Sequence, residues 1–197
     1  TLCRKGGPHI WGGGMHHDGV RSSYGGAGGA MKLLSFGHNW VILCVCLPLP
    51  WNTRRAIAVP IGFRLYRSKK RCPARLYRKR TELARELVEK VVARIPEDRE
   101  VMLVGDTEYA CRVIVRNLPE RIKFVGPMNM GAALYAPPPA KGTYRGRPRK
   151  KGKRLRSPKQ LIADNRTRWK RRTLVLYGRE VEVLIKTQVC LWYTVAG

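Results

Sequence analysis

The chain has 197 residues and carries 40 Lys and Arg against 13 Asp and Glu, a formal net charge of +27. This excess is far larger than solubility requires and favours a polyanionic partner, above all nucleic acid. With 44% hydrophobic residues, the composition excludes a fully disordered chain, and the length suits one domain with an insertion. No signal peptide opens the chain, and its longest apolar run, residues 41–51, is too short to cross a bilayer. We therefore expect a soluble, cytoplasmic protein with no membrane partner.

The first part of the chain predicts short strands and then a hairpin. The first 40 residues are rich in glycine, which is typical of turns between short strands. Residues 39–51 and 54–66 then predict two strands joined by a turn at Asn52 and Thr53. Pro60 lies inside the second strand and indicates an edge or a bulge.

Neither the histidines nor the cysteines follow the spacing of a metal site. The histidines lie in or near Gly-rich turns, and only Asp18 stands at ligand spacing from them, so accidental clustering is the better interpretation. The cysteines form no Cys-x-x-Cys pair, and we expect reduced, buried thiols. These residues are His9, His16, His17 and His38, and Cys3, Cys44, Cys46, Cys72, Cys111 and Cys190.

The clearest helix prediction is "TELARELVEKVVARIP", residues 81–96. Thr81 suits the N-cap position, Pro96 ends the helix, and Glu86 and Lys90 are spaced for an ion pair one turn apart. The apolar positions form one stripe. They are Leu83, Leu87, Val88, Val91, Val92 and Ile95.

The chain then alternates between strand and helix. Residues 101–105 predict a strand, residues near 108–118 a shorter helix, and residues 121–128 a further strand. Two antiparallel strands followed by alternating helix and parallel strand indicate an α/β sheet.

Asp106 follows the strand 101–105, whose apolar sequence is typical of a buried strand. Functional groups gather at the carboxyl ends of strands in α/β sheets, and a carboxylate there can hold a hard divalent cation. The alternative is that Asp106 is a helix N-cap, a common role for Asp after a strand. From the residues alone the capping role is favoured, with Glu108 as a first-turn acid that suits the helix dipole.

Two stretches concentrate the positive charge. Residues 64–80 hold nine Lys or Arg and no acid, and residues 141–172 hold fifteen, with only Asp164 opposed. Beyond Pro127 the chain becomes rich in Pro, Gly and basic residues, which indicates an exposed loop or insertion. Two strands, 172–178 and 180–195, are predicted to follow around a turn at Gly178.

Several segments, in the same order along nearly the whole chain, resemble the DDE-type transposases of bacterial insertion sequences. They are "TLCRKGGPHIWGGGMHHDG", "TELARELVEKVVARIP", "VMLVGDTEYA", "NLPERIKFVGPMNMGAALYAPPP", "GTYRGRPRKKGKRL" and "CLWYTVAG". The resemblance implies an α/β, RNase H-like mixed sheet with flanking helices, a partial catalytic core over residues 1–128 and a basic, β-rich insertion over residues 129–197. By position, Asp106 is similar to the second Asp of the catalytic triad.

The resemblance also implies that the first catalytic Asp falls before Thr1 and the final Glu after Gly197, so we expect an internal fragment, incomplete at both ends. Asp18 is no substitute, because it sits in a Gly-bounded turn.

The implied reaction is hydrolysis of a DNA strand at a transposon end, followed by attack of the freed 3′-hydroxyl on target DNA. It implies Mg²⁺ or Mn²⁺, two ions in the complete domain, with Asp106 as a ligand. Transposon ends and target DNA are the implied partners, with self-association on DNA. The alternatives are a non-catalytic basic protein that binds nucleic acid and a decayed transposase remnant.

Candidate DNA-binding residues come from both basic stretches. "YRGRPRKKGKR", residues 144–154, is similar to an AT-hook, whose Arg-Gly-Arg core lies in a narrow minor groove. A flexible basic loop that contacts phosphates fits equally well. Trp169 could stack on an unpaired base, but a core position at a strand start is the safer interpretation. The candidates are Arg145, Arg147, Arg149, Lys150, Lys151, Lys153 and Arg154, with Lys69, Lys70 and Arg71.

Overall fold

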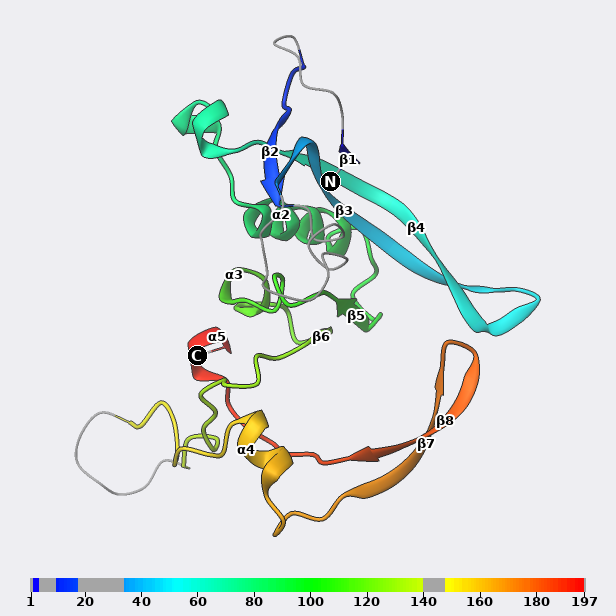
Figure 1. The fold of residues 1–197 in the computed structure, drawn as a ribbon, viewed down its shortest axis with the longest axis vertical. Coiled ribbons are helices and arrows are strands. Elements are labelled where there is room, and N and C mark those ends of the chain that lie inside the picture. Colours follow the sequence, from blue (N-terminus) through cyan, green and yellow to red (C-terminus); the bar gives the residue numbers. More distant parts are fainter. Residues whose placement is uncertain (1, 4–9, 18–33, 140–147, 197) are drawn as a thin grey trace. The chain divides into compact units, whose positions relative to one another are not determined.

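The computed structural model describes residues 2–3, 10–17, 34–139 and 148–196 (Figure 1). The chain divides into two compact units. Unit 1 comprises Thr1–Cys46 and Ala58–Arg94, and unit 2 comprises Leu47–Ile57 and Ile95–Gly197. Within the described ranges, no helix is both long and apolar enough to cross a membrane.

Unit 1 is built on a four-stranded sheet with β3 at its centre. β1 and β2 pair antiparallel with β3, and β4 also pairs with β3. Side chains of β3 alternate between buried and less buried from Ser35 to Val41, as expected for a strand with one face on a core. The strands are β1 (Leu2–Cys3), β2 (Gly14–His17), β3 (Leu34–Leu49) and β4 (Asn52–Tyr66).

The predicted hairpin of β3 and β4 is confirmed, but the predicted turn is wrong. The chain reverses at Pro50 and Trp51, and Asn52 is already the first residue of β4. A proline donates no ladder hydrogen bond, which favours Pro50 in the turn over a place in a strand. In the described part of the chain β4 pairs only with β3, so Pro60 lies on an edge strand as predicted.

The predicted helix is present as α2 (Arg80–Val92), with different ends. The Glu82 carboxylate accepts a hydrogen bond of 2.8 Å from the Lys79 backbone N–H, and Thr81 lies inside the first turn instead of capping it. The helix stops at Val92, before Pro96. The ion pair between Lys90 Nζ and Glu86 is confirmed at 2.8 Å, and Arg64 of β4 joins it at 3.0 Å.

The apolar stripe of α2 is buried at Leu83, Leu87 and Val88, whereas Val91 and Val92 are half-buried. Among the sheet residues that the structure describes, Val41 of β3 is a buried apolar side chain. Two 3-10 turns, η1 (Lys69–Arg71) and η2 (Ala74–Leu76), carry the basic stretch between β4 and α2.

His16 and His17 lie on β2 and His38 on β3, so the prediction that these histidines sit in turns is wrong. His16 is 6% exposed, while its neighbour His17 is exposed on the opposite face of the strand. The His16 ring meets Tyr66 edge-on, with 5.7 Å between ring centroids. Burial, and then the charge of Arg80, hold the pKa of His16 below its usual value. His9 and Asp18 lie outside the described residues.

We expect His16 to make unit 1 less stable in acid. Because the folded state disfavours protonation of His16, the unfolded chain takes up a proton first as the pH falls below about 6.5. The free energy of unfolding should therefore fall between pH 7.5 and pH 5.5, where the wild type loses more stability than His16→Gln does. Urea unfolding at the two pH values measures this difference. His17→Gln is the matched control, because it removes the exposed neighbouring histidine from the same strand.

In its described residues, unit 2 contains a parallel pair of strands, a hairpin and three short helices. β5 and β6 are parallel, as predicted, with Val101 opposite Ile122 and Val104 opposite Val125. The elements are β5 (Val101–Val104), α3 (Arg112–Val115), β6 (Ile122–Val125), α4 (Pro158–Ala163), β7 (Lys170–Leu176), β8 (Arg179–Ile185) and α5 (Tyr193–Ala196). The buried apolar side chains are Ala110, Ile114, Ile122, Ala132, Leu134 and Val195.

Two further predictions for unit 2 are wrong in extent. The helix predicted near 108–118 is only the single turn α3, preceded by turns, and α3 packs on α5. The strand predicted to run to residue 195 stops at Ile185, and α5 forms instead at the end of that segment. The hairpin turn itself is confirmed, because Tyr177 and Gly178 both have positive φ, 53° and 77°, as a two-residue primed turn requires.

The fold is α/β, as predicted, but the described strands form three separate sheets instead of a single mixed sheet. β5 and β6 pair with each other, and β7 and β8 pair with each other. The expectation of reduced thiols is confirmed for five cysteines, but the expectation that they are buried is wrong, because Cys46 is exposed and the other four are half-buried. These five are Cys44, Cys46, Cys72, Cys111 and Cys190.

Candidate functional site

Asp106 stands at the carboxyl end of β5, beside the carboxyl end of the parallel strand β6. The Gly105 N–H donates to Val125 O at 3.0 Å, which joins the two strand ends. A Cβ on Gly105 would lie 3.0 Å from Tyr109 Cβ, so glycine permits this close turn. The strand is not buried as predicted, because Met102 and Val104 are exposed. Asp106 therefore lies at an accessible edge of the sheet.

One oxygen of Asp106 caps the turn that follows it. Oδ1 accepts hydrogen bonds from the backbone N–H groups of Glu108 at 2.9 Å and Tyr109 at 3.4 Å. The residues alone favoured a helix N-cap with Glu108 in the first helical turn, and that prediction is wrong, because Cys111 is the N-cap of α3 and Asp106 caps the separate turn before it. Among the described residues, Oδ2 accepts no hydrogen bond, and the side chain is exposed. The carboxylate thus keeps one oxygen for another ligand while the other oxygen holds the turn.

The described residues do not fit a complete metal site. They contain no group of three or more His, Cys, Asp or Glu side chains placed to hold one ion. A site for two divalent ions needs several carboxylates, and Asp106 offers a single available oxygen. Further acidic ligands would be required beside Asp106 for such an ion to bind.

Of the predicted DNA-binding residues of unit 1, two are accessible to a ligand and one is held by contacts within the protein. Lys69 and Lys70 are exposed on η1, and no hydrogen bond or ion pair holds either ammonium group within the described residues. Arg71 is different, because its Nη1 donates to Gly13 O at 3.0 Å and its guanidinium lies 5.5 Å from the centre of the Phe36 ring. Lys69 and Lys70 are therefore the accessible members of this set.

The second basic stretch is held to unit 2 near Lys151. The Lys151 ammonium lies 4.2 Å from the centre of the Tyr135 ring and 5.0 Å from that of Tyr193. Backbone hydrogen bonds tie Gly152 and Lys153 to Ala136 at 3.0 and 2.8 Å. Arg149, Lys150, Lys153 and Arg154 are exposed beside this anchor. Arg145 and Arg147, the proposed minor-groove pair, lie outside the described residues.

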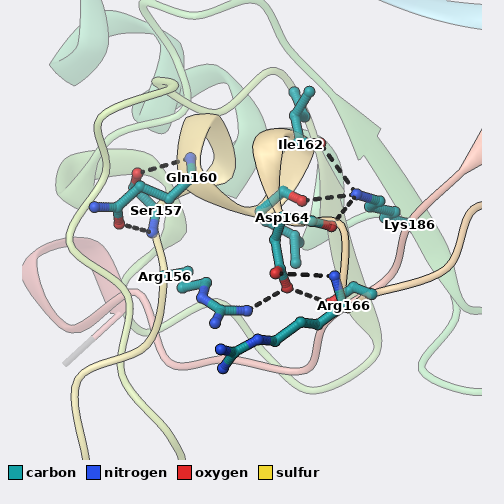
Figure 2. Close-up of polar contacts among 9 residues, drawn as sticks. Arg156, Ser157, Gln160, Ile162, Asp164, Arg166 and Lys186 are labelled. Atoms are coloured by element: carbon teal, nitrogen blue, oxygen red, sulfur yellow. Dashed lines mark hydrogen bonds and ion pairs between the residues drawn. The ribbon is translucent and has the colours of Figure 1, made fainter.

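Asp164, the only acid of the second basic stretch, organises the residues around it (Figure 2). Its Oδ2 accepts from Arg156 and from the Thr167 hydroxyl, the latter at 2.8 Å, and its Oδ1 accepts from the Arg166 N–H at 3.1 Å. The Thr167 hydrogen bond, followed by the Arg166 N–H and the charges of Arg156 and Lys186, holds the pKa of Asp164 below its usual range. The stretch expected to be an exposed loop is therefore locally ordered here.

Lys186 closes the end of α4. Its ammonium donates to the carbonyl oxygens of Leu161, Ile162 and Asp164 at 3.0, 3.0 and 2.8 Å (Figure 2). The same ammonium lies 4.3 Å from the centre of the Trp169 ring. Trp169 is 45% exposed, so the expectation of a core tryptophan is wrong. Lys186 thus joins α4 to the start of β7.

Sequence reasoning missed α4, although a signal for it was present. Ser157 and Gln160 form a reciprocal capping box, in which Gln160 N–H donates to Ser157 Oγ at 3.3 Å and Ser157 N–H donates to Gln160 Oε1 at 3.0 Å. Pro158 follows the cap, a position that suits proline. The sequence "SPKQ" predicts such a helix start. No comparable local signal marked Lys186.

We expect Lys186→Met to loosen α4 while it preserves the apolar stem of the side chain. The three carbonyl oxygens lose a charged donor, and a hydrogen bond to a charged group contributes about 1.5–3 kcal/mol. Amide exchange at Leu161, Asp164 and Arg166 should accelerate by at least about tenfold. Lys159→Met is the matched control, because this exposed ammonium on α4 has no partner in the described part of the chain. Equal exchange rates in both variants would contradict the role given to Lys186.

Comparison with protein-family models matches residues 5–180 to a family described as DDE superfamily endonuclease. A search of curated proteins and a search of solved structures gave no match. The family match spans β2 to the start of β8, and it includes Asp106 and both basic stretches.

Proposed function

Because this chain belongs to the DDE superfamily of endonucleases, we propose that it cleaves DNA strands as part of the transposase of a bacterial insertion sequence. The observation that carries the proposal is Asp106, an exposed carboxylate with one available oxygen at the joined carboxyl ends of two parallel strands. An acid at that position suits a reaction centre in an α/β fold. Asp106 is proposed as one catalytic carboxylate.

The proposed architecture is an RNase H-like catalytic core over residues 1–128, with a basic, β-rich insertion over residues 129–197. The parallel pair β5 and β6 and the preceding helix α2 support the first part. The hairpin of β7 and β8, with α4 and the Asp164 cluster before it, supports the second.

In the proposed reaction, water attacks a backbone phosphorus and the bond from phosphorus to the 3′ oxygen breaks. The products are a 3′-hydroxyl and a 5′-phosphate. The 3′-hydroxyl then attacks a phosphorus of the target DNA, and the bond from that phosphorus to the target strand's own 3′ oxygen breaks, which leaves a 3′-hydroxyl on the target strand. Endonucleases of this superfamily generally use divalent metal ions. Mg²⁺ or Mn²⁺ is the proposed ion, and the described residues do not form a complete site for it.

DNA is the proposed partner, both as transposon end and as target. A net charge of +27 supports a polyanionic ligand, and the cations concentrate in two stretches. Lys69, Lys70, Lys150 and Lys153 are exposed cations suited to phosphate contacts. Arg71 and Lys151 are engaged within the protein, so their contribution to binding would be indirect. The protein is also proposed to self-associate on DNA.

A second candidate function is binding of nucleic acid without catalysis. It is favoured by the capping role of Asp106 Oδ1 and by the lack of a metal-ligand group in the described ranges. Incubation of the protein with supercoiled plasmid distinguishes the two functions. With Mg²⁺ present, an enzyme converts it to nicked product over time, whereas a binder retards it on a gel and leaves it intact. Retardation that disappears at high salt, with no nicks, would reject the enzyme proposal.

A further inference from the structure

Unit 1 contains a small cavity with two arginines in its wall. Its volume is about 70 Å³, several times the ~10–15 Å³ that admits one water. The lining residues are Leu65, Arg67, Cys72, Leu76, Arg78 and Leu83. Leu65 and Leu83 make part of the wall apolar, whereas Leu76 and Arg78 are exposed to solvent. The cavity therefore has the size and polarity to hold a small polar group against two cations.

Arg67 is held in place by contacts within unit 1. Its Nη2 donates to Arg71 O at 2.7 Å, and its guanidinium lies 5.0 Å from the centre of the Trp11 ring. The Nε atom is closed to solvent and has no hydrogen-bond partner among the described residues, so it does not face the open cavity. The two contacts nevertheless hold the positive charge of the Arg67 guanidinium at the wall of the cavity.

No carboxylate of the described chain neutralises these two arginines. Arg78 Nη1 donates only to a backbone oxygen, that of Tyr77, at 3.0 Å. Residues 64–80 contain no acid, and the nearest acids along the chain, Glu82 and Glu86, are occupied by Lys79 N–H and by Lys90 and Arg64. An anion from outside the protein is the group that would complete the cavity.

We propose that this cavity binds a phosphate oxyanion, and that its natural source is a phosphodiester of the DNA backbone. Arginine donates several N–H groups from a rigid plane, an arrangement that suits phosphate oxygens. The residues that line the cavity belong to unit 1, and Asp106 belongs to unit 2. The choice of DNA as the source of the phosphate rests on the proposed function. The binding of an oxyanion follows from the residues that line the cavity.

The test compares Arg78→Gln with Arg75→Gln. Both remove one exposed cation of the same basic stretch, but only Arg78 lines the cavity. Inorganic phosphate, against chloride at equal ionic strength, should raise the Tm of the wild type and of Arg75→Gln by roughly 2–4 °C. It should leave the Tm of Arg78→Gln unchanged. An equal rise in both variants, or none in the wild type, would overturn the phosphate site.

A second arm identifies the source of the phosphate. Binding of a short duplex is measured without divalent ions, with phosphate replacing chloride at fixed ionic strength. Phosphate should weaken duplex binding several-fold in the wild type and in Arg75→Gln, but not in Arg78→Gln. Stabilisation by phosphate without this competition would overturn the DNA assignment. Neither measurement depends on cleavage, so a protein that never cuts DNA can still show both effects. Failure of the phosphate site is therefore distinguishable from failure of the proposed cleavage activity.

Discussion

Asp106→Asn is expected to abolish DNA cleavage while the protein stays as stable as the wild type. Asparagine is as good a cap as aspartate, so its side-chain oxygen can still accept from the Glu108 and Tyr109 N–H groups. The substitution therefore removes the negative charge and preserves the turn. If Asp106 is a catalytic carboxylate, the cleavage rate should fall by more than about 100-fold, beyond the loss typical of residues that only support a reactive group. Rates are measured with plasmid DNA, and folding by urea unfolding.

Asp106→Ala separates the two roles of the side chain. Alanine removes both the charge and the cap, so it should lose cleavage and also cost about 0.5–2 kcal/mol of stability. If Asp106 only caps the turn, Asp106→Asn should cleave DNA like the wild type, and only Asp106→Ala should be affected. That pattern would contradict the catalytic role.

Ile114→Ala is expected to have the largest effect on stability. Ile114 is 2% exposed on α3, which packs on α5 in the core of unit 2. Truncation of a buried isoleucine to alanine removes apolar contacts and leaves a cavity, which costs roughly 2–5 kcal/mol. Urea unfolding of the variant, followed by circular dichroism, should show a lower midpoint.

Val113→Ala is the matched control for this prediction. Val113 precedes Ile114 on the same short helix and is 42% exposed. Its truncation should change the free energy of unfolding by less than about 1 kcal/mol, because little burial is lost. Equal losses in the two variants would show that α3 does not present Ile114 to a core.

The elements with strong periodicity could be predicted from the sequence. α2 has an apolar stripe at helical spacing, and the turn at Gly178 has the glycine that a primed hairpin turn favours. The ends of these elements were less predictable. A side chain that accepts a hydrogen bond from a backbone N–H near the end of an element can shift the residue at which that element begins. Glu82, for example, satisfies the Lys79 N–H and moves the start of α2 ahead of Thr81.

The site was predictable only in part. Asp106 stands after a strand with a glycine before it, so its place at a strand end follows from local sequence. Contacts between residues distant along the chain do not follow from local pattern. Lys186 meets the end of α4 from more than twenty residues away, and Lys151 lies between Tyr135 and Tyr193. Such contacts turned a stretch expected to be a loop into ordered structure.

We propose Asp106 as one catalytic carboxylate of a transposase that cleaves DNA strands by hydrolysis. The most direct measurement identifies the chemical ends that the wild-type protein creates on a labelled duplex in Mg²⁺. The account predicts 3′-hydroxyl ends that a polymerase can extend, with none after chelation of the metal or in Asp106→Asn. An intact duplex, ends that cannot be extended, or equal product from Asp106→Asn would contradict it.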